Sequence, residues 1–197
     1  DVEHHRAVVP VSPDWRDPSG LLGYFNALHA DPTYQAEPAL RLVLAAAKRP
    51  DLPYFLILDE MNLVRVEHYF APFLSAMETG EPLALHHEDD AIDGVAPQLL
   101  WPSNLFVAGT VNMDETTHAF SDKVLDRAFT VETWDVDLDA LFLTRARSDD
   151  VFVRVTKALR AMHDALRPAR RHFGYRSAHE VIEFVTVGAR ECGDDTA

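Results

Sequence analysis

The sequence has little cysteine and no long hydrophobic run. Cys192 is the only cysteine among 197 residues, which excludes an internal disulfide framework and a cysteine-based zinc site. No apolar stretch approaches the roughly 20 residues that a membrane-spanning helix needs, and residues 1–5 lack the basic and apolar parts of a signal peptide. We therefore expect a cytoplasmic protein with no membrane partner.

Basic residues are also scarce. Residues 1–150 hold 10 Lys and Arg against 26 Asp and Glu, whereas residues 151–197 hold 8 against 6, and the formal net charge is -14. This acidic body argues against a general nucleic-acid binder, because affinity for phosphates comes from a basic face. Only three of the 18 basic residues are lysines, and arginine favours fixed, bidentate contacts to carboxylate or phosphate groups.

Two well-known motifs are missing. No glycine is followed by lysine, so the chain contains no Gly-x-x-x-x-Gly-Lys-Ser/Thr loop (P-loop), which would cradle phosphates with its backbone amides. The chain also has no Gly-x-Ser-x-Gly motif, which argues against a serine hydrolase.

The apolar pattern predicts an α/β body at residues 1–136 and a small helical lid at residues 137–197. Residues 54–58 form an apolar run without alternation, which is typical of a strand buried on both faces of a parallel sheet. The other expected strands are at residues 6–11, 105–111 and 129–131, with a hairpin at residues 83–100. Helices are expected after Pro38, over residues 64–77 with a kink or restart at Pro72, over residues 151–166, and after a capping box at residues 177–180.

Polar side chains follow the ends of two predicted strands. Asp59 and Glu60 come directly after the first of them, and Asn112 follows the strand at residues 105–111. Ligands of open α/β sheets bind beyond the carboxyl ends of the strands. One carboxylate there can hold a hydrated magnesium ion, and its neighbour or an amide can orient a water for attack on a phosphate. The alternative is that the acids begin a loop and that Asn112 belongs to an ordinary turn.

Two arginines are candidates for phosphate contacts. Arg127 stands at the end of an element, from where it can reach the nucleotide of a neighbouring subunit. The alternative is a local ion pair with Asp126 or Asp122. Arg176 stands immediately before the expected lid helix, where it can close over phosphates.

The remaining polar and aromatic clusters are interpreted as surface or packing. His86, His87 and the three acids after them could hold a metal, but adjacent residues on a hairpin tip rarely converge on one ion, so we expect a solvated tip. The basic cluster before the lid helix is expected to be solvated as well, and the aromatic residues near the N-terminus are expected to pack under a loop. These residues are Arg167, Arg170, Arg171 and His172, and Trp15, Tyr24 and Phe25.

In combination, five segments resemble the McrB-type branch of the AAA+ NTPases, within the MoxR and dynein-related group. They follow the order of that family and extend over most of the chain. The segments are residues 13–24, residues 56–62 (Leu-Ile-Leu-Asp-Glu-Met-Asn), residues 109–115 (Gly-Thr-Val-Asn-Met-Asp-Glu), residues 125–129 (Leu-Asp-Arg-Ala-Phe) and residues 173–176 (Phe-Gly-Tyr-Arg).

The resemblance implies a role for each candidate residue. Asp59 is similar to the Walker B ligand that binds Mg²⁺ through water, and Glu60 to the catalytic base. Asn112 resembles sensor 1, Arg127 the trans-acting arginine finger and Arg176 the sensor 2 arginine. Asp114 and Glu115, in the loop after sensor 1, leave open whether ATP or GTP is preferred.

The resemblance also implies an assembly and a missing segment. Members of this branch form ring hexamers, and several couple hydrolysis to DNA translocation in modification-dependent restriction, which makes a nuclease subunit and DNA candidate partners. The family's P-loop strand would lie between the sensor 1 strand and the strand expected at residues 129–131, so its absence should leave a gap in the sheet or force the sheet to repack. We expect the module to be an NTPase and this chain alone to be inactive. The alternatives are a non-catalytic AAA+ scaffold and a MoxR-like ATPase that remodels proteins.

Overall fold

The chain divides into two compact units, Asp1–Phe129 and Thr130–Ala197. The computed structural model describes residues 5–28, 32–112, 117–145 and 149–191. The sequence placed the boundary after residue 136. The segment at residues 130–136 therefore belongs to the helical unit and does not end the α/β body.

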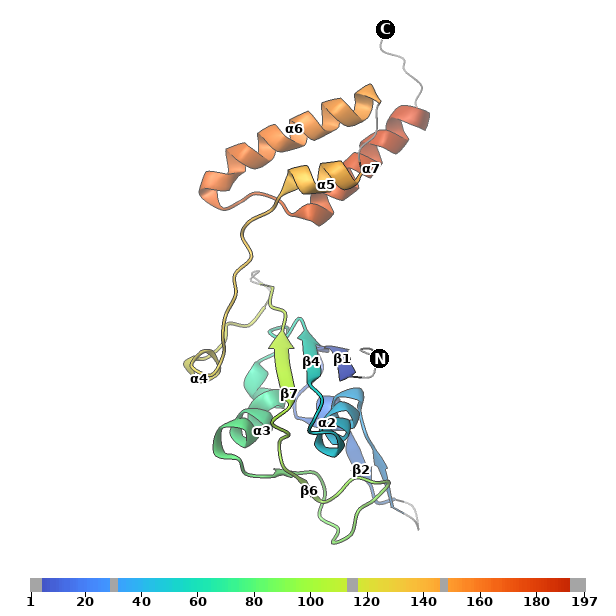
Figure 1. Ribbon diagram of the computed structural model, residues 1–197, viewed down its shortest axis with the longest axis vertical. Coiled ribbons are helices and arrows are strands. Elements are labelled where there is room, and N and C mark those ends of the chain that lie inside the picture. Colours follow the sequence, from blue (N-terminus) through green and yellow to red (C-terminus); the bar gives the residue numbers. More distant parts are fainter. Residues whose placement is uncertain (1–4, 29–31, 113–116, 146–148, 192–197) are drawn as a thin grey trace. The chain divides into compact units, whose positions relative to one another are not determined.

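A three-stranded parallel sheet forms the centre of the first unit (Figure 1). Its order is β1 (Arg6–Pro10), β4 (Tyr54–Asp59) and β7 (Leu105–Gly109), with β4 in the middle. In this register Pro10 lies opposite Asp59 and Leu58 opposite Gly109. The predicted α/β class and the parallel strands at these three places are confirmed.

Within the described part of the first unit, helices cover one face of this sheet. The helices α2 (Pro38–Lys48) and α3 (Val66–Thr79) pack with Leu56 and Leu58 in one apolar core. The strands advance in one direction from β1 to β4 to β7, so right-handed crossovers place both helices on the same face. On the other face Phe55 and Phe106 are about half exposed and stack with their ring centroids 5.6 Å apart. The prediction that residues 54–58 are buried on both faces is therefore wrong.

The fourth predicted strand, at residues 129–131, does not form. Phe129 is fully exposed and Val131 is 85% exposed, and neither belongs to a strand. A strand requires a hydrogen-bonded neighbour, and in the described ranges no strand pairs with the outer edge of β7 or of β1. The apolar sequence of residues 129–131 is not sufficient to form a strand without such a neighbour.

Helix α3 continues through Pro72 for 14 residues, so the predicted restart does not occur. Proline at this position removes one main-chain donor. The helix nevertheless buries an apolar face on both sides of it, including Tyr69 and Phe73, which are fully buried. Gly80 ends the helix in the left-handed conformation (φ 70°), which glycine adopts without steric cost.

Short elements extend the first unit. The predicted hairpin at residues 83–100 is confirmed as the antiparallel pair β5 and β6, whereas the antiparallel pair β2 and β3 was not predicted. These strands pair because Phe25 faces Tyr34 across them, and the buried Tyr34 ring adds to the core. The bounds are α1 (Ser19–Leu22), β2 (Tyr24–Asn26), β3 (Thr33–Gln35), β5 (Leu83–Ala84), β6 (Gln98–Leu99) and α4 (Asp122–Leu125).

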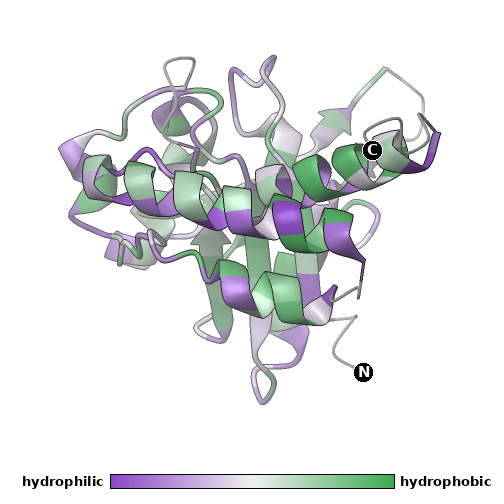
Figure 2. Ribbon diagram, turned by 90° about the horizontal axis from the view of Figure 1, so that it is seen from above, coloured by the Kyte–Doolittle hydropathy of each residue, from purple (hydrophilic) through white to green (hydrophobic). Residues whose placement is uncertain are grey.

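The second unit consists of α5 (Leu138–Thr144), α6 (Asp150–Leu166), a 3-10 turn (Arg167–Ala169) and α7 (Tyr175–Glu191). Its helices carry both hydrophobic and hydrophilic residues (Figure 2), and their apolar faces meet around Phe142, Leu159 and Ile182. Helix α7 begins two residues before Ser177, so the predicted capping box is not used. None of the helices in the described ranges is both long and apolar enough to cross a lipid bilayer.

Candidate functional site

The candidate site lies at the edge of the sheet where β4 and β7 end. The arrows of these strands point to the same edge in Figure 1. Asp59 is the last residue of β4 and Glu60 follows it, while Thr110 and Asn112 follow β7. Because the strands are parallel and adjacent, the register itself brings these four residues together.

Thr110 joins the two acidic residues. Its hydroxyl donates a hydrogen bond to Asp59 Oδ1 (2.6 Å) and accepts one from the Glu60 main-chain N–H (2.9 Å). In the described part of the chain no residue bonds to Asp59 Oδ2. One carboxylate oxygen is therefore fixed in direction, and the other is available to a ligand. The sequence analysis assigned no role to Thr110.

Asn112 contacts Glu60 directly. Its side-chain Nδ2 donates a hydrogen bond to Glu60 Oε1 at 3.1 Å. Both side chains are exposed, so water can reach the carboxylate. Asn112 and Glu60, which are 52 positions apart in the sequence, are thus in direct contact. The Asn112 amide fixes the direction of the Glu60 carboxylate without adding charge.

Glu60 has a strained backbone. Its φ is 55°, in the left-handed region that residues other than glycine rarely adopt. Such a conformation costs on the order of 1–3 kcal/mol and persists only where the surroundings enforce it. Here Met61 N–H bonds to Thr110 O (2.8 Å), and the hydroxyl of the buried Tyr69 donates to Met61 O (2.8 Å). Burial also raises the pKa of the Tyr69 hydroxyl, which remains protonated as this donor requires.

This strain has a measurable consequence. We expect Glu60→Gly to be about 1 kcal/mol more stable than Glu60→Ala, because glycine alone adopts positive φ without steric cost. Urea unfolding followed by circular dichroism measures the difference. Arg41 is an exposed position within α2, and there the alanine variant should be more stable than the glycine variant. Glycine destabilises a helix by about 1 kcal/mol relative to alanine. Equal or greater stability of Glu60→Ala would show that the left-handed backbone is not formed.

The residues present fit a hydrated divalent cation better than a closed metal site. The described residues contain no group of three or more His, Cys, Asp or Glu side chains that could hold an ion. Asp59 supplies one free carboxylate oxygen with a fixed direction, and Mg²⁺ is usually bound through one or two carboxylates while it retains several waters. Asp59 would therefore hold the ion through water, and other ligands would have to come from a bound phosphate.

Arg127 is engaged within its own chain. Its Nε donates to Glu78 Oε2 (3.0 Å), its Nη2 bonds to the same oxygen, and its Nη1 donates to Lys123 O. Glu78 belongs to α3 and not to the local acids considered from the sequence. The guanidinium side chain remains 34% exposed and the carboxylate 54% exposed. This pair is accessible to solvent, and such exposed pairs contribute only about 0–1 kcal/mol.

Arg176 lies in the second unit, in the first turn of α7, and is exposed. No described residue forms an ion pair or a hydrogen bond with its guanidinium group. Asp114, Glu115 and Cys192 lie outside the described residues.

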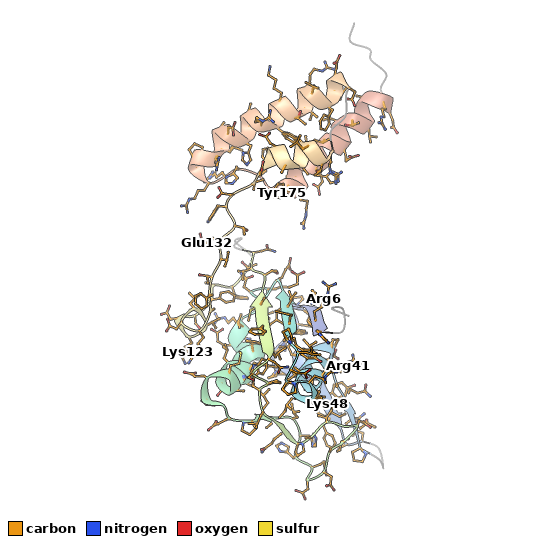
Figure 3. All side chains as sticks on the ribbon, in the orientation of Figure 1. Arg6, Arg41, Lys48, Lys123, Glu132 and Tyr175 are labelled. Atoms are coloured by element: carbon orange, nitrogen blue, oxygen red, sulfur yellow. The ribbon has the colours of Figure 1, made fainter. Side chains whose placement is uncertain are left out.

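The arginines of the basic cluster are exposed, as predicted, but Arg167 and Arg170 have partners in the segment before α5. In the second unit Arg167 pairs with Asp135 (3.1 Å), and the Arg170 guanidinium lies 5.1 Å from the centre of the Trp134 ring. His172 Nε2 donates to Trp134 O (2.7 Å), and Tyr175, labelled in Figure 3, accepts a hydrogen bond from Asp137 N–H (2.8 Å). Much of the basic cluster therefore anchors the segment before α5, a contact between distant residues that local charge patterning does not reveal.

His86 is buried, not solvated. It is 7% exposed, it lies near the rings of Phe25 and Tyr34 (5.9 Å between centroids in each case), and its Nε2 donates to Val95 O. The acids after it are exposed. The first histidine thus packs the hairpin onto the β2–β3 pair, and the tip itself is solvated.

Compared with known proteins, the chain matches no protein-family model and no curated protein.

Proposed function

We propose that the first unit is the metal- and water-handling part of an AAA+ nucleoside triphosphatase of the McrB type. The observation that carries this proposal is the hydrogen bond between Asn112 and Glu60, beside Asp59, at the carboxyl edge of a parallel sheet. An acid that only began a loop would need neither the amide partner nor a strained backbone.

Each residue at this edge has a distinct task. Asp59 Oδ2 would hold the water shell of a bound Mg²⁺, and Thr110 keeps that carboxylate in place through Oδ1. The ion, when bound with ATP or GTP, neutralises charge on the phosphates. Glu60 accepts a proton from the attacking water through its exposed carboxylate, and Asn112 fixes the direction of that carboxylate and of the water.

The phosphate cradle has to come from residues outside this chain, because the sequence contains no P-loop. The sheet supports this view. Thr110 N–H bonds to Leu58 O, so by alternation the main-chain groups of Val107 and Gly109 face away from β4, where no described strand pairs with them. The resemblance places the P-loop strand at this edge, and its helix would cover the exposed rings of Phe55 and Phe106.

The two arginines would act after assembly. Arg176 is exposed and unpaired among the described residues, which suits a sensor of phosphates. Arg127 would have to leave Glu78 to act as a finger in a neighbouring subunit, and the exposure of this pair makes that exchange inexpensive. A homo-oligomeric ring, as a hexamer, is the assembly we propose, with a nuclease subunit and DNA as the partners that the resemblance suggests.

The proposal predicts that the 197-residue chain alone hydrolyses ATP and GTP at less than about one hundredth of the rate of a protein in which a P-loop segment precedes it. The physical reason is the lack of backbone amides and lysine around the phosphates. Magnesium-dependent phosphate release from the two proteins measures the ratio. Comparable rates, or no hydrolysis by the longer protein, would contradict the proposal.

A non-catalytic scaffold is the second candidate, favoured by the pairing of Arg127 with Glu78 in its own chain. In that function the arginine would stabilise the packing of α4 on α3, and no nucleotide would be turned over. Glu78→Gln distinguishes the two: a scaffold loses stability only, whereas an NTPase ring gains or keeps turnover as Arg127 is released.

A further inference from the structure

The buried side chain of Asn62 holds the main chain of Asn112. Asn62 is 1% exposed. Its Nδ2 donates a hydrogen bond to Asn112 O (2.8 Å), and its Oδ1 accepts one from Asn112 N–H (3.3 Å). In an antiparallel sheet, a residue of a hydrogen-bonded pair donates one hydrogen bond to the opposite residue and accepts one from it. The carboxamide of Asn62 thus replaces a neighbouring strand at this point.

Among the described residues, few others support residues 111–112 after the end of β7. The ladder to β4 ends at Thr110, which bonds to Leu58 O and Met61 N–H. Asn112, two residues further, is exposed. Apart from Asn62, the Thr117 hydroxyl bonds to this main chain among the described residues, donating to Asn112 O (2.7 Å). The path of residues 111–112 therefore depends on Asn62.

Asn62 is itself fixed to the turn that carries Glu60. Leu63 N–H bonds to Glu60 O (2.9 Å), which closes the turn, and His118 N–H bonds to Asn62 O (2.9 Å). One rigid turn thus determines both the position of the Glu60 carboxylate and the position of the Asn112 main chain. The turn at residues 60–63 therefore sets the distance between the Glu60 carboxylate and the Asn112 amide.

We propose that Asn62 is a positioning residue, which places the Asn112 amide on the Glu60 carboxylate through the Asn112 main chain. Its catalytic consequence rests on the proposed function, but the contact can be tested without nucleotide. Asn62 touches neither metal nor substrate in this proposal, and its effect is transmitted entirely through the two hydrogen bonds to Asn112.

The test is a double-mutant cycle read by NMR on the 197-residue chain. In the wild-type background, Glu60→Gln is expected to move the side-chain NH₂ resonances of Asn112, because it removes the charge that they face. In the Asn62→Ala background most of this displacement should be lost, because Asn112 no longer faces residue 60. Circular dichroism verifies that each variant is folded. If Asn62→Ala does not fold, Asn62→Ser serves instead, since one hydroxyl cannot span both main-chain groups.

Asn104→Ala is the matched control. Asn104 is another asparagine that bonds the main chain, with Nδ2 donating to the carbonyls of Ala46, Arg49 and Leu52, but it lies at the opposite end of β7. Its loss should destabilise the fold and leave the full Glu60→Gln displacement. Retention of the full displacement in Asn62→Ala would overturn the proposal. So would the absence of any displacement in the wild-type background, because there would then be no contact to position.

Kinetics then distinguish this inference from the proposed function. In a protein that includes a P-loop segment, Asn62→Ala should lower kcat about 10- to 100-fold, the range typical of outer residues that orient a catalytic group, with little change in KM. Asn104→Ala should leave kcat unchanged. A protein that shows the expected NMR result but hydrolyses no nucleotide would refute the proposed function and leave the positioning role intact.

Discussion

Replacing Glu60 with glutamine is expected to lower the kcat of the complete NTPase about 10²- to 10⁴-fold, the usual contribution of a general base. Glutamine retains the length of the side chain and an oxygen that can accept from Asn112 Nδ2, but it cannot accept a proton from water. Because Asp59 and the phosphate contacts are unchanged, nucleotide should still bind and should remain trapped. Phosphate release and retention of labelled nucleotide after gel filtration measure the two effects.

The matched control for this charge change is Glu81→Gln. Glu81 follows the end of α3, and its side chain is exposed to solvent. The Glu81→Gln substitution removes one negative charge from the same unit and should leave both turnover and nucleotide retention unchanged. Turnover by Glu60→Gln within threefold of the wild-type rate would mean that another group accepts the proton, and the assignment of Glu60 would then be wrong.

The sequence was sufficient to predict that Asp59, Glu60 and Asn112 lie at or beyond the ends of strands, because strand ends are local features. The apolar run before Asp59 and the one before Asn112 each end where polar residues begin, and parallel strands place such ends on one edge. The direct contact of Asn112 with Glu60 follows from adjacency of the two strands.

The roles of Thr110 and Asn62 could not be predicted in the same way. They depend on register, because the pairing of Leu58 with Gly109 is what sets the Thr110 hydroxyl between Asp59 Oδ1 and Glu60 N–H. A shift of one residue would turn that hydroxyl to the other face of the sheet. Without the pairing register of β4 and β7, the sequence predicts which residue types lie at the edge of the sheet but not which hydrogen bonds they form.

The remaining errors have one physical origin, which is the use of local sequence to predict contacts between distant elements. Residues 54–58 are apolar enough for two covered faces, but the direction of the crossovers covers only one. Arg127 was paired with nearby acids, whereas its partner Glu78 is 49 positions away. Residues 129–131 have a suitable strand sequence but no strand beside them. In each case the missing information is which element lies next to which.

Thr110→Val is expected to lower the kcat of the complete NTPase about 10- to 100-fold, as loss of an orienting outer contact typically does. Valine has nearly the shape of threonine, but it can neither donate to Asp59 Oδ1 nor accept from Glu60 N–H. The Asp59 carboxylate and the Glu60 main chain then lose their shared support. The Asp59 side chain becomes free to rotate, and the left-handed backbone of Glu60 loses one of the bonds that enforce it. We also expect the apparent affinity for Mg²⁺ to fall, which a titration of turnover against magnesium measures.

Thr110→Ser separates the hydroxyl from the shape of the side chain, because serine keeps both hydrogen bonds and loses only a methyl group. It should retain turnover and magnesium affinity close to those of the wild type. If Thr110→Val were as active as Thr110→Ser, the hydroxyl bridge would have no catalytic effect. The orientation of Asp59 and Glu60 would then come from the sheet and from the other contacts of the described residues, among them the bond between Asn112 and Glu60.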